Sequence, residues 1–133
     1  MINEKYLKKF NGNPGVDKKL LLDLNLPDNT PSDYLSFLQL HNGGEGFIGE
    51  EYLILYKVED LKQMNANYEV EKFTPGIFLI GSNGGGEAIA FDLRENQSKV
   101  ILIPFMFEYD AIIELGKNME EFFQKVYEKG YFG

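Results

Sequence analysis

The chain has 133 residues, of which 44% are hydrophobic and 14% aromatic, enough to bury the core of one ordinary domain. It contains no cysteine, which excludes disulfides, thiolate metal sites and thiol nucleophiles. The formal net charge of −8 argues against direct binding of nucleic acid, because affinity for phosphate backbones comes from clusters of lysine and arginine.

No repeat, low-complexity segment or linker divides the sequence, so we expect a single domain over residues 1–133. The first ten residues have no apolar run of the kind found in a signal peptide. The longest apolar run, Val100 to Phe107, is too short to cross a bilayer and contains Pro104. We therefore expect a cytoplasmic protein without a membrane partner.

The N-terminal part of the chain is predicted to be helical. Residues 3–10 are expected to form a short helix, which the segment 11–15, Asn-Gly-Asn-Pro-Gly, ends. Residues 18–24 are largely apolar and are also expected to be helical. A turn over residues 26–29 follows, because proline, aspartate and asparagine favour turns.

Thr30 and Pro31 form a signal for the start of the next helix. Thr30 is expected to be the N-cap, and Pro31 suits the first helical position, where a missing N–H costs nothing. Glycine adopts the left-handed conformation that ends many helices. Asn42, Gly43 and Gly44 are therefore interpreted as a structural cap and turn.

Most of the remaining chain is predicted to form a sheet. Strands are expected over residues 47–48, 52–56, 77–80, 88–91, 100–105 and 111–115. A polar helix is expected over residues 58–72, and a last helix is expected to begin after Asn118 as its N-cap. The connections from Ile77 onward are too short for parallel crossovers. The sequence thus predicts an α+β fold in which an antiparallel sheet of about six strands is flanked by helices.

The glycine-rich segment 81–87 has the composition of a phosphate-binding loop but not its pattern. A Walker loop continues through lysine and serine or threonine into a helix, whereas Glu87 and a predicted strand follow here. Asn-Gly is a strong signal for a type I′ hairpin. Asn83, Gly84, Gly85 and Gly86 are therefore interpreted as a structural turn.

Few residues in the sequence have the pattern of a catalytic or metal site. His41 is the only histidine, which excludes a multi-histidine metal site, and it is interpreted as a residue at a helix end. Neither a Gly-x-Ser-x-Gly elbow nor a calcium loop occurs. We expect no metal, cofactor or catalytic residue. An enzyme acting on a carbohydrate or another small molecule is the least favoured alternative, and it would need two carboxylates facing each other across a cleft.

Acidic residues beside turns are the candidate contacts with another protein. Glu50 and Glu51 precede one predicted strand, and Glu108, Tyr109 and Asp110 follow another. An acidic surface favours basic partners, and an aromatic ring among carboxylates suits a contact surface. The same residues would also be expected without a partner, because charged residues are common in solvated turns and a negative charge keeps a small protein soluble.

Four blocks of the sequence occur together in a recognisable order. They are the Leu-Pro, Asp-Tyr-Leu-Ser-Phe-Leu and Asn-Gly-Gly-Glu-Gly stretch within residues 26–46, the glycine-rich hairpin at 81–92, the strand at 100–104 and the phenylalanine-rich helix at 119–127. In these blocks the chain resembles the SUKH superfamily, which contains fungal cell-wall synthesis regulators and many bacterial immunity proteins. It departs from the family pattern where Asn83 stands at a position often held by aspartate, and where residues 28–30 separate Leu-Pro from the helix.

The resemblance implies an antiparallel sheet flanked by helices, with glycine segments that are structural. It also implies a non-catalytic, protein-binding module of the immunity type, which neutralises a toxin domain such as a nuclease. The alternative is a regulatory or scaffold domain without a toxin partner, as in the fungal relatives. Exposed tyrosines and phenylalanines would equally suit a homodimer.

Overall fold

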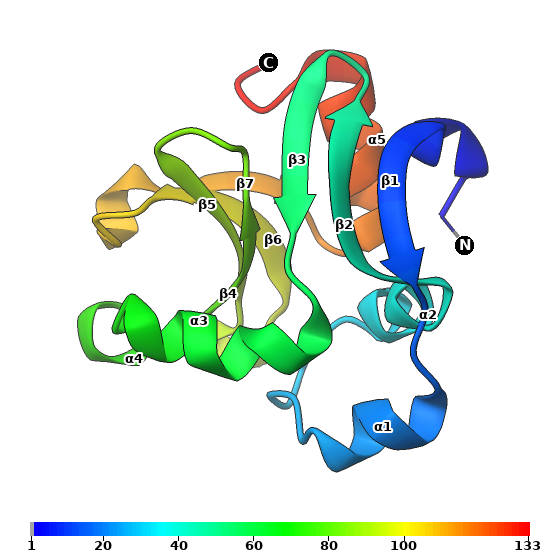
Figure 1. Cartoon of the computed structure of the whole chain (residues 1–133). Helices are drawn as coiled ribbons and strands as arrows, with labels where there is room; N and C mark the ends of the chain where they lie inside the picture. Colours follow the sequence, from blue (N-terminus) through cyan, green and yellow to red (C-terminus); the bar gives the residue numbers. More distant parts are fainter. Residues whose placement is uncertain (1) are drawn as a thin grey trace.

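Seven strands pair in the order of the chain to form one antiparallel sheet (Figure 1). The structure is a computed structural model that describes residues 2–133. The strands are β1 (Lys9–Pro14), β2 (His41–Ile48), β3 (Glu51–Leu55), β4 (Ile77–Ser82), β5 (Glu87–Asp92), β6 (Lys99–Pro104) and β7 (Ile113–Gly116). This meander confirms the predicted α+β fold, with seven strands in place of about six.

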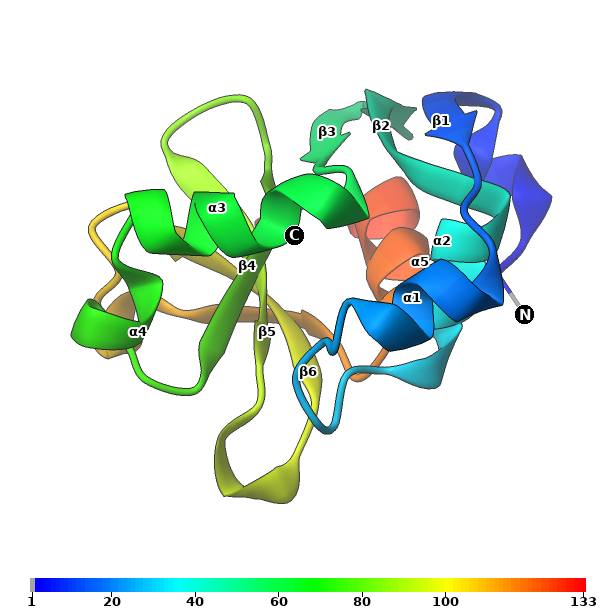
Figure 2. The same cartoon turned by 60° about the horizontal axis from the view of Figure 1, so that its bottom comes forward.

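Helices lie on both faces of the sheet (Figure 2). The α-helices are α1 (Lys18–Asp23), α2 (Ser32–Leu40), α3 (Leu61–Asn67), α4 (Val70–Phe73) and α5 (Met119–Lys129). The short 3-10 helices are η1 (Glu4–Leu7), η2 (Val58–Asp60), η3 (Arg94–Asn96) and η4 (Tyr109–Ala111). Helices α2 and α5 pack on one face, and α3 and α4 cover part of the other.

Helix α5 begins where the sequence predicts and presents one apolar face to the core. The side chain of its N-cap, Asn118, accepts a hydrogen bond from the backbone N–H of Glu121. Four residues at the spacing of helical turns are buried: Met119, Phe122, Phe123 and Val126. This spacing places all four on the side that meets the sheet and α2.

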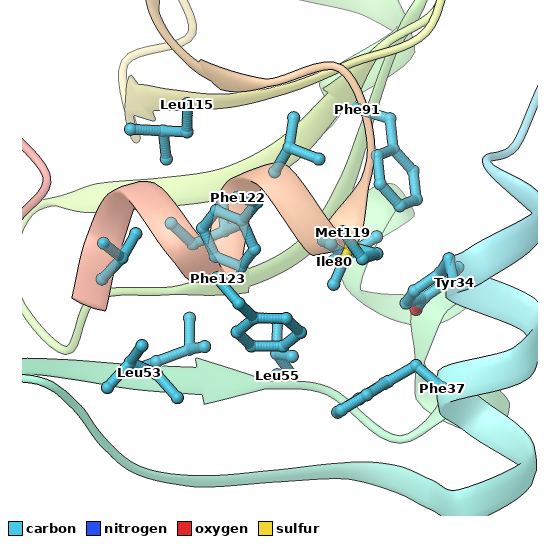
Figure 3. Close-up of a cluster of buried hydrophobic side chains, with 14 of the residues drawn as sticks. Tyr34, Phe37, Leu53, Leu55, Ile80, Phe91, Leu115, Met119, Phe122 and Phe123 are labelled. Carbon is cyan, nitrogen blue, oxygen red and sulfur yellow. The ribbon is translucent and has the colours of Figure 1, made fainter. Parts of the chain in front are cut away.

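The main core lies between α5, α2 and the sheet (Figure 3). Phe37 of α2 packs against Phe123 with ring centroids 5.5 Å apart. Tyr34 of α2 meets Phe91 of β5 edge to face, with centroids 5.0 Å apart. Such aromatic pairs add about 0.5–1.5 kcal/mol beyond their buried area. These contacts hold α2 against both α5 and the middle of the sheet.

A second core lies on the opposite face of the sheet, beneath α3 and α4. Its buried members are Val70, Ile77, Leu79, Ala88, Ala90, Ile101, Ile103 and Phe107. Strands β4, β5 and β6 contribute to both cores, which explains their continuous apolar runs. Among the described residues, none of the buried members of the second core comes from β1, β2 or β3.

The structure corrects the prediction for the first fifteen residues. A helix forms only over Glu4–Leu7, and the segment expected to break it is strand β1. This strand pairs with β2, so that Phe10 lies opposite Gly46 and Asn11 opposite Glu45. The sequence does not indicate a strand here because only one of the six residues of β1, Phe10, is buried, so no alternation of apolar and polar residues is visible. Pairing with a distant strand thus overrides the local turn signal.

The prediction for the ends of α2 is also corrected. The hydroxyl of Thr30 donates to the carbonyl of Pro27 at 2.6 Å, and Pro31 occupies the N-cap position without a side-chain cap. The helix ends at Leu40, and the residues expected to form its cap, Asn42, Gly43 and Gly44, lie within β2.

The glycines of β2 serve the sheet rather than the helix. Gly44 has φ +143, and a side chain there would clash with the backbone of Asn11 and Gly12 in β1. A side chain at Gly43, which has φ +68, would come within 2.5 Å of the carbonyl oxygens of Leu55 and Tyr56. Glycine is therefore needed in β2 because the neighbouring backbones approach closely.

The helix expected over residues 58–72 is divided into η2, α3 and α4. The division between α3 and α4 lies at Glu69, which has the left-handed φ of 52. The break lets α4 turn so that Val70 is buried in the second core. No glycine or proline marks the break in the sequence, so the local pattern did not predict it.

Candidate protein-interaction surface

One side of strands β1–β3 is left open by the helices. Helix α5 lies behind these strands in Figure 1, whereas α3 and α4 pack in the second core against the neighbouring strands that begin with β4. We call this side the outer face and define it by the residues that alternate onto it: Lys9, Asn11, Glu45, Phe47, Tyr52 and Ile54. The residues between them, such as Ile48 and Leu53, point into the main core.

An aromatic pair lies on the outer face. Phe47 and Tyr52 are directly opposite each other in β2 and β3, and their rings meet edge to face with centroids 5.2 Å apart. Phe47 is 47% exposed, which is unusual for a phenylalanine in a strand that is otherwise packed. The pair is thus a preformed apolar contact in which Tyr52 is partly buried and Phe47 is exposed.

Glu45 holds the Tyr52 ring in place. The Tyr52 hydroxyl donates a hydrogen bond to the Glu45 carboxylate on the neighbouring strand. This hydrogen bond raises the pKa of Tyr52 above its ordinary value, because the adjacent carboxylate disfavours the phenolate. A ring that is oriented before binding loses little side-chain entropy when a partner covers it.

The predicted contact residues Glu50 and Glu51 lie at one end of the outer face and have different surroundings. Glu50 is exposed in the turn between β2 and β3. Glu51 is partly buried, and its carboxylate accepts a hydrogen bond from the backbone N–H of Tyr131 at 2.9 Å. The Tyr131 hydroxyl in turn donates to the backbone carbonyl of Tyr52 at 2.6 Å. Glu51 therefore anchors the C-terminal segment, and Glu50 is free to face a partner.

The other predicted contacts, Glu108, Tyr109 and Asp110, do not join this surface. They lie around η4, which is the orange-yellow turn at the left of Figure 1. The β2–β3 turn lies at the top of the same view, far from η4. The Tyr109 hydroxyl donates to the carbonyl of Pro75 at 2.7 Å, and the Arg94 guanidinium lies 4.3 Å from its ring centroid. Tyr109 therefore fastens its loop, whereas both carboxylates are exposed.

The glycine-rich segment forms the hairpin between β4 and β5, as predicted, and borders the outer face. The Asn83 side chain accepts from the Gly85 N–H at 2.9 Å and donates to the Glu87 carboxylate at 2.8 Å. A type I′ turn needs two residues with positive φ, but only Gly84 has one in this loop, so the predicted turn type is wrong. A side chain at Gly84 would reach the Tyr52 ring at 3.3 Å, while Gly86 faces open space.

Asn42 has a structural role that the sequence indicated only in general terms. Its side-chain oxygen accepts from the Val58 N–H at 2.8 Å, and its amide donates to the Glu59 carboxylate at 2.6 Å. The second hydrogen bond lowers the pKa of Glu59 below its ordinary value. Asn42 thus fixes the start of η2 against β2. His41 is partly buried at the end of α2, with its ring 5.7 Å from that of Phe37.

Three further findings concern pockets, metal sites and membrane spans. An apolar groove of about 490 Å³ lies between residues 24–27 and α3, and Glu59 is the one carboxylate among its lining residues. Within residues 2–133, no three histidine or carboxylate side chains are grouped as a metal site requires. Of the helices in the described part of the chain, none combines the length and the hydropathy of a membrane span.

Sequence reasoning missed the outer face itself. It assigned residues 47–48 and 52–56 to strands but did not identify which of their faces would remain uncovered. The available signal was alternation, since Glu45, Phe47 and Tyr52 alternate with glycines and aliphatic residues. Alternation identifies two faces, but only the packing of α2 and α5 against one of them decides which one stays open.

Comparison with known proteins places this architecture in a family. None of the curated proteins matches the chain. The model of the SMI1 / KNR4 family (SUKH-1) matches residues 23–125, which include α2, strands β2–β7 and the first part of α5. The match confirms the resemblance seen in the four sequence blocks. The chain therefore belongs to the SMI1 / KNR4 family (SUKH-1).

Proposed function

We propose that this SUKH domain is a protein-binding module of the immunity type, which neutralises a toxin domain by covering its active surface. The observation that carries the proposal is the outer face, where the exposed Phe47 and the oriented Tyr52 lie on the side of β2 and β3 that no described helix covers. The net charge of −8 favours a toxin with a basic surface, such as a nuclease that binds nucleic acid.

The two kinds of residue on this surface would contribute differently to the complex. Buried aromatic side chains near the centre of an interface carry much of the binding energy, which suits Phe47 and Tyr52. Carboxylates at the rim mainly raise the association rate with a basic partner, which suits Glu50. Glu108 and Asp110 form a separate acidic group that provides the rival site for the same kind of partner.

The proposal is tested with a toxin domain encoded beside the gene for this chain. Affinity and association rate are measured by surface plasmon resonance, together with inhibition of the toxin's activity. Phe47→Ala is expected to weaken binding by about thirtyfold, because a hot-spot residue contributes about 2 kcal/mol or more. Phe73→Ala, which removes another exposed phenylalanine from α4, is the matched control and is expected to change affinity less than about twofold.

Charge reversal distinguishes the two acidic groups. Glu50→Lys is expected to slow association several-fold at low salt, and the effect is expected to shrink at high salt. The double variant Glu108→Lys/Asp110→Lys is expected to associate with the toxin at a rate close to that of the wild-type protein. The reverse pattern would move the site to the loop around η4. A neighbouring toxin that the wild-type chain neither binds nor inhibits would favour the regulatory or scaffold alternative.

A further inference from the structure

A pocket that shares Lys9 and Phe47 with the outer face lies where η1, the end of β2 and the last turns of α5 meet. It has a volume of about 140 Å³. Its lining consists of three lysines, three aromatic residues and a glycine: Lys5, Lys8, Lys9, Tyr6, Phe47, Tyr127 and Gly49. We call it the lysine corner. No carboxylate belongs to this lining, although acidic residues outnumber basic ones by 21 to 13 in the chain.

Among the described residues, three of the thirteen cations form ion pairs, and none of the three lies in the lysine corner. Lys72, Arg94 and Lys99 each lie within 3.6 Å of a carboxylate oxygen. In the described part of the chain, no ion pair involves Lys5, Lys8 or Lys9. Lys5 instead lies over the Tyr6 ring, 5.4 Å from its centroid. Like charges that lie close together repel one another, and a bound anion would relieve that repulsion.

Aromatic rings and a tight backbone contact give the corner a fixed shape. Tyr6 is buried and packs against Tyr127 with ring centroids 5.0 Å apart. Phe47 and Tyr127 are 47% and 41% exposed, so they offer apolar surface beside the ammonium groups. Gly49, at φ +61, brings the β2–β3 turn against α5, and a side chain there would come within 2.7 Å of the Tyr127 carbonyl oxygen.

We propose that the lysine corner binds an acidic peptide segment of a protein partner. Carboxylates of the segment pair with Lys5, Lys8 and Lys9, and one of its apolar or aromatic side chains packs between Phe47 and Tyr127. A short peptide needs only this local positive charge. A nucleic acid would also meet the field of a chain with net charge −8, which repels an extended polyanion.

The proposal is tested with a synthetic peptide of glutamates around one tyrosine, and with the same peptide in which glutamines replace the glutamates. Binding is followed through amide chemical shifts in two-dimensional NMR spectra of the full chain. The glutamate peptide is expected to shift the amides of Lys8, Phe47 and Gly49, and the glutamine peptide is not. Affinity is expected to fall as salt is raised, because exposed charges are screened.

Two pairs of variants make the test specific. Lys5→Glu/Lys8→Glu is expected to lower the affinity for the glutamate peptide about tenfold, since it replaces two attractions with repulsions. Lys18→Glu/Lys19→Glu makes the same change of charge on the exposed side of α1 and is expected to weaken it less than about twofold. If charge reversal impairs folding, Lys5→Gln/Lys8→Gln serves instead, with an expected loss of about threefold.

Three outcomes would overturn the proposal. The first is an equal loss of peptide affinity in both double variants. The second is a set of peptide-induced chemical-shift changes that lie away from the corner. The third is that single-stranded RNA or anionic lipid vesicles bind at the corner and the peptide does not. The test uses neither a toxin nor a change at Phe47. It can therefore fail while the immunity function holds, or succeed while that function fails.

Discussion

Asp33 links two helices that are far apart in the sequence, and its removal is expected to destabilise the whole fold. It lies in the first turn of α2, but its two carboxylate oxygens accept hydrogen bonds from the backbone N–H groups of Met119 at 3.1 Å and Glu120 at 3.0 Å. Asn118 accepts from the next N–H, that of Glu121. These side chains satisfy three of the four N–H groups that are left free at the start of α5.

The expected magnitude follows from these contacts. A net hydrogen bond to a charged group contributes about 1.5–3 kcal/mol, and the value is lower where water competes. The Met119 N–H is part-buried and that of Glu120 is exposed, so we assign about 1 kcal/mol to each. Asp33→Ala is therefore expected to lower the free energy of unfolding by about 2 kcal/mol, and Asp33→Asn by about 1 kcal/mol, because asparagine retains one acceptor oxygen.

The measurement is urea unfolding followed by circular dichroism. Asp110→Ala, at an exposed aspartate in η4, is the control and is expected to cost less than about 0.5 kcal/mol. Combining Asp33→Ala with Asn118→Ala is expected to give a coupling above about 0.5 kcal/mol, since both residues cap the same helix. An Asp33→Ala variant as stable as the Asp110→Ala variant would refute the reasoning.

Three further predictions concern the described contacts. Gly44→Ala is expected to cost more than about 2 kcal/mol because a side chain there clashes with the β1 backbone, whereas Gly86→Ala in open space is expected to cost less than about 0.5 kcal/mol; thermal unfolding of both variants tests this. Phe122→Ala, at a fully buried site, is expected to cost about 3–5 kcal/mol in urea unfolding. The lowered pKa of Glu59 means that its contribution to stability is complete above its ordinary pKa and is lost as the pH falls through the folded value. Glu59→Gln is therefore expected to lose less stability than the wild type between about pH 5 and pH 3, and equal losses would contradict the assigned role of Asn42.

Much of the fold could be predicted because its central elements carry their own local signals. The strands that form β4, β5 and β6 have continuous apolar runs, which match their burial on both faces. The last helix has an N-cap at Asn118 and a buried stripe at helical spacing. Short connections then leave an antiparallel order as the simplest arrangement of these strands.

The elements that were missed are those that distant contacts determine. Residues 11–15 have the composition of a turn and residues 3–10 were expected to be helical, yet residues 9–14 form β1 because β2 supplies their hydrogen-bonding partners. Gly43 and Gly44 are typical of a helix end, yet the close approach of β1 and of residues 55–56 places them within a strand. Local rules describe only the conformation that a segment prefers by itself. Leaving the backbone N–H and C=O groups of a neighbouring strand without partners costs free energy, so pairing with a distant strand can override that preference.

The candidate surface could not be predicted for a related reason, and that reason bears on its function. Glu45, Phe47 and Tyr52 alternate with residues that fill the main core, so the same strands stabilise the fold on one side and present a surface on the other. Stability comes from contacts with α2 and α5, none of which depends on the identity of the outward side chains. The outward side chains are therefore free to differ without loss of the fold, and such freedom suits the proposed binding module, which would have to match one particular partner.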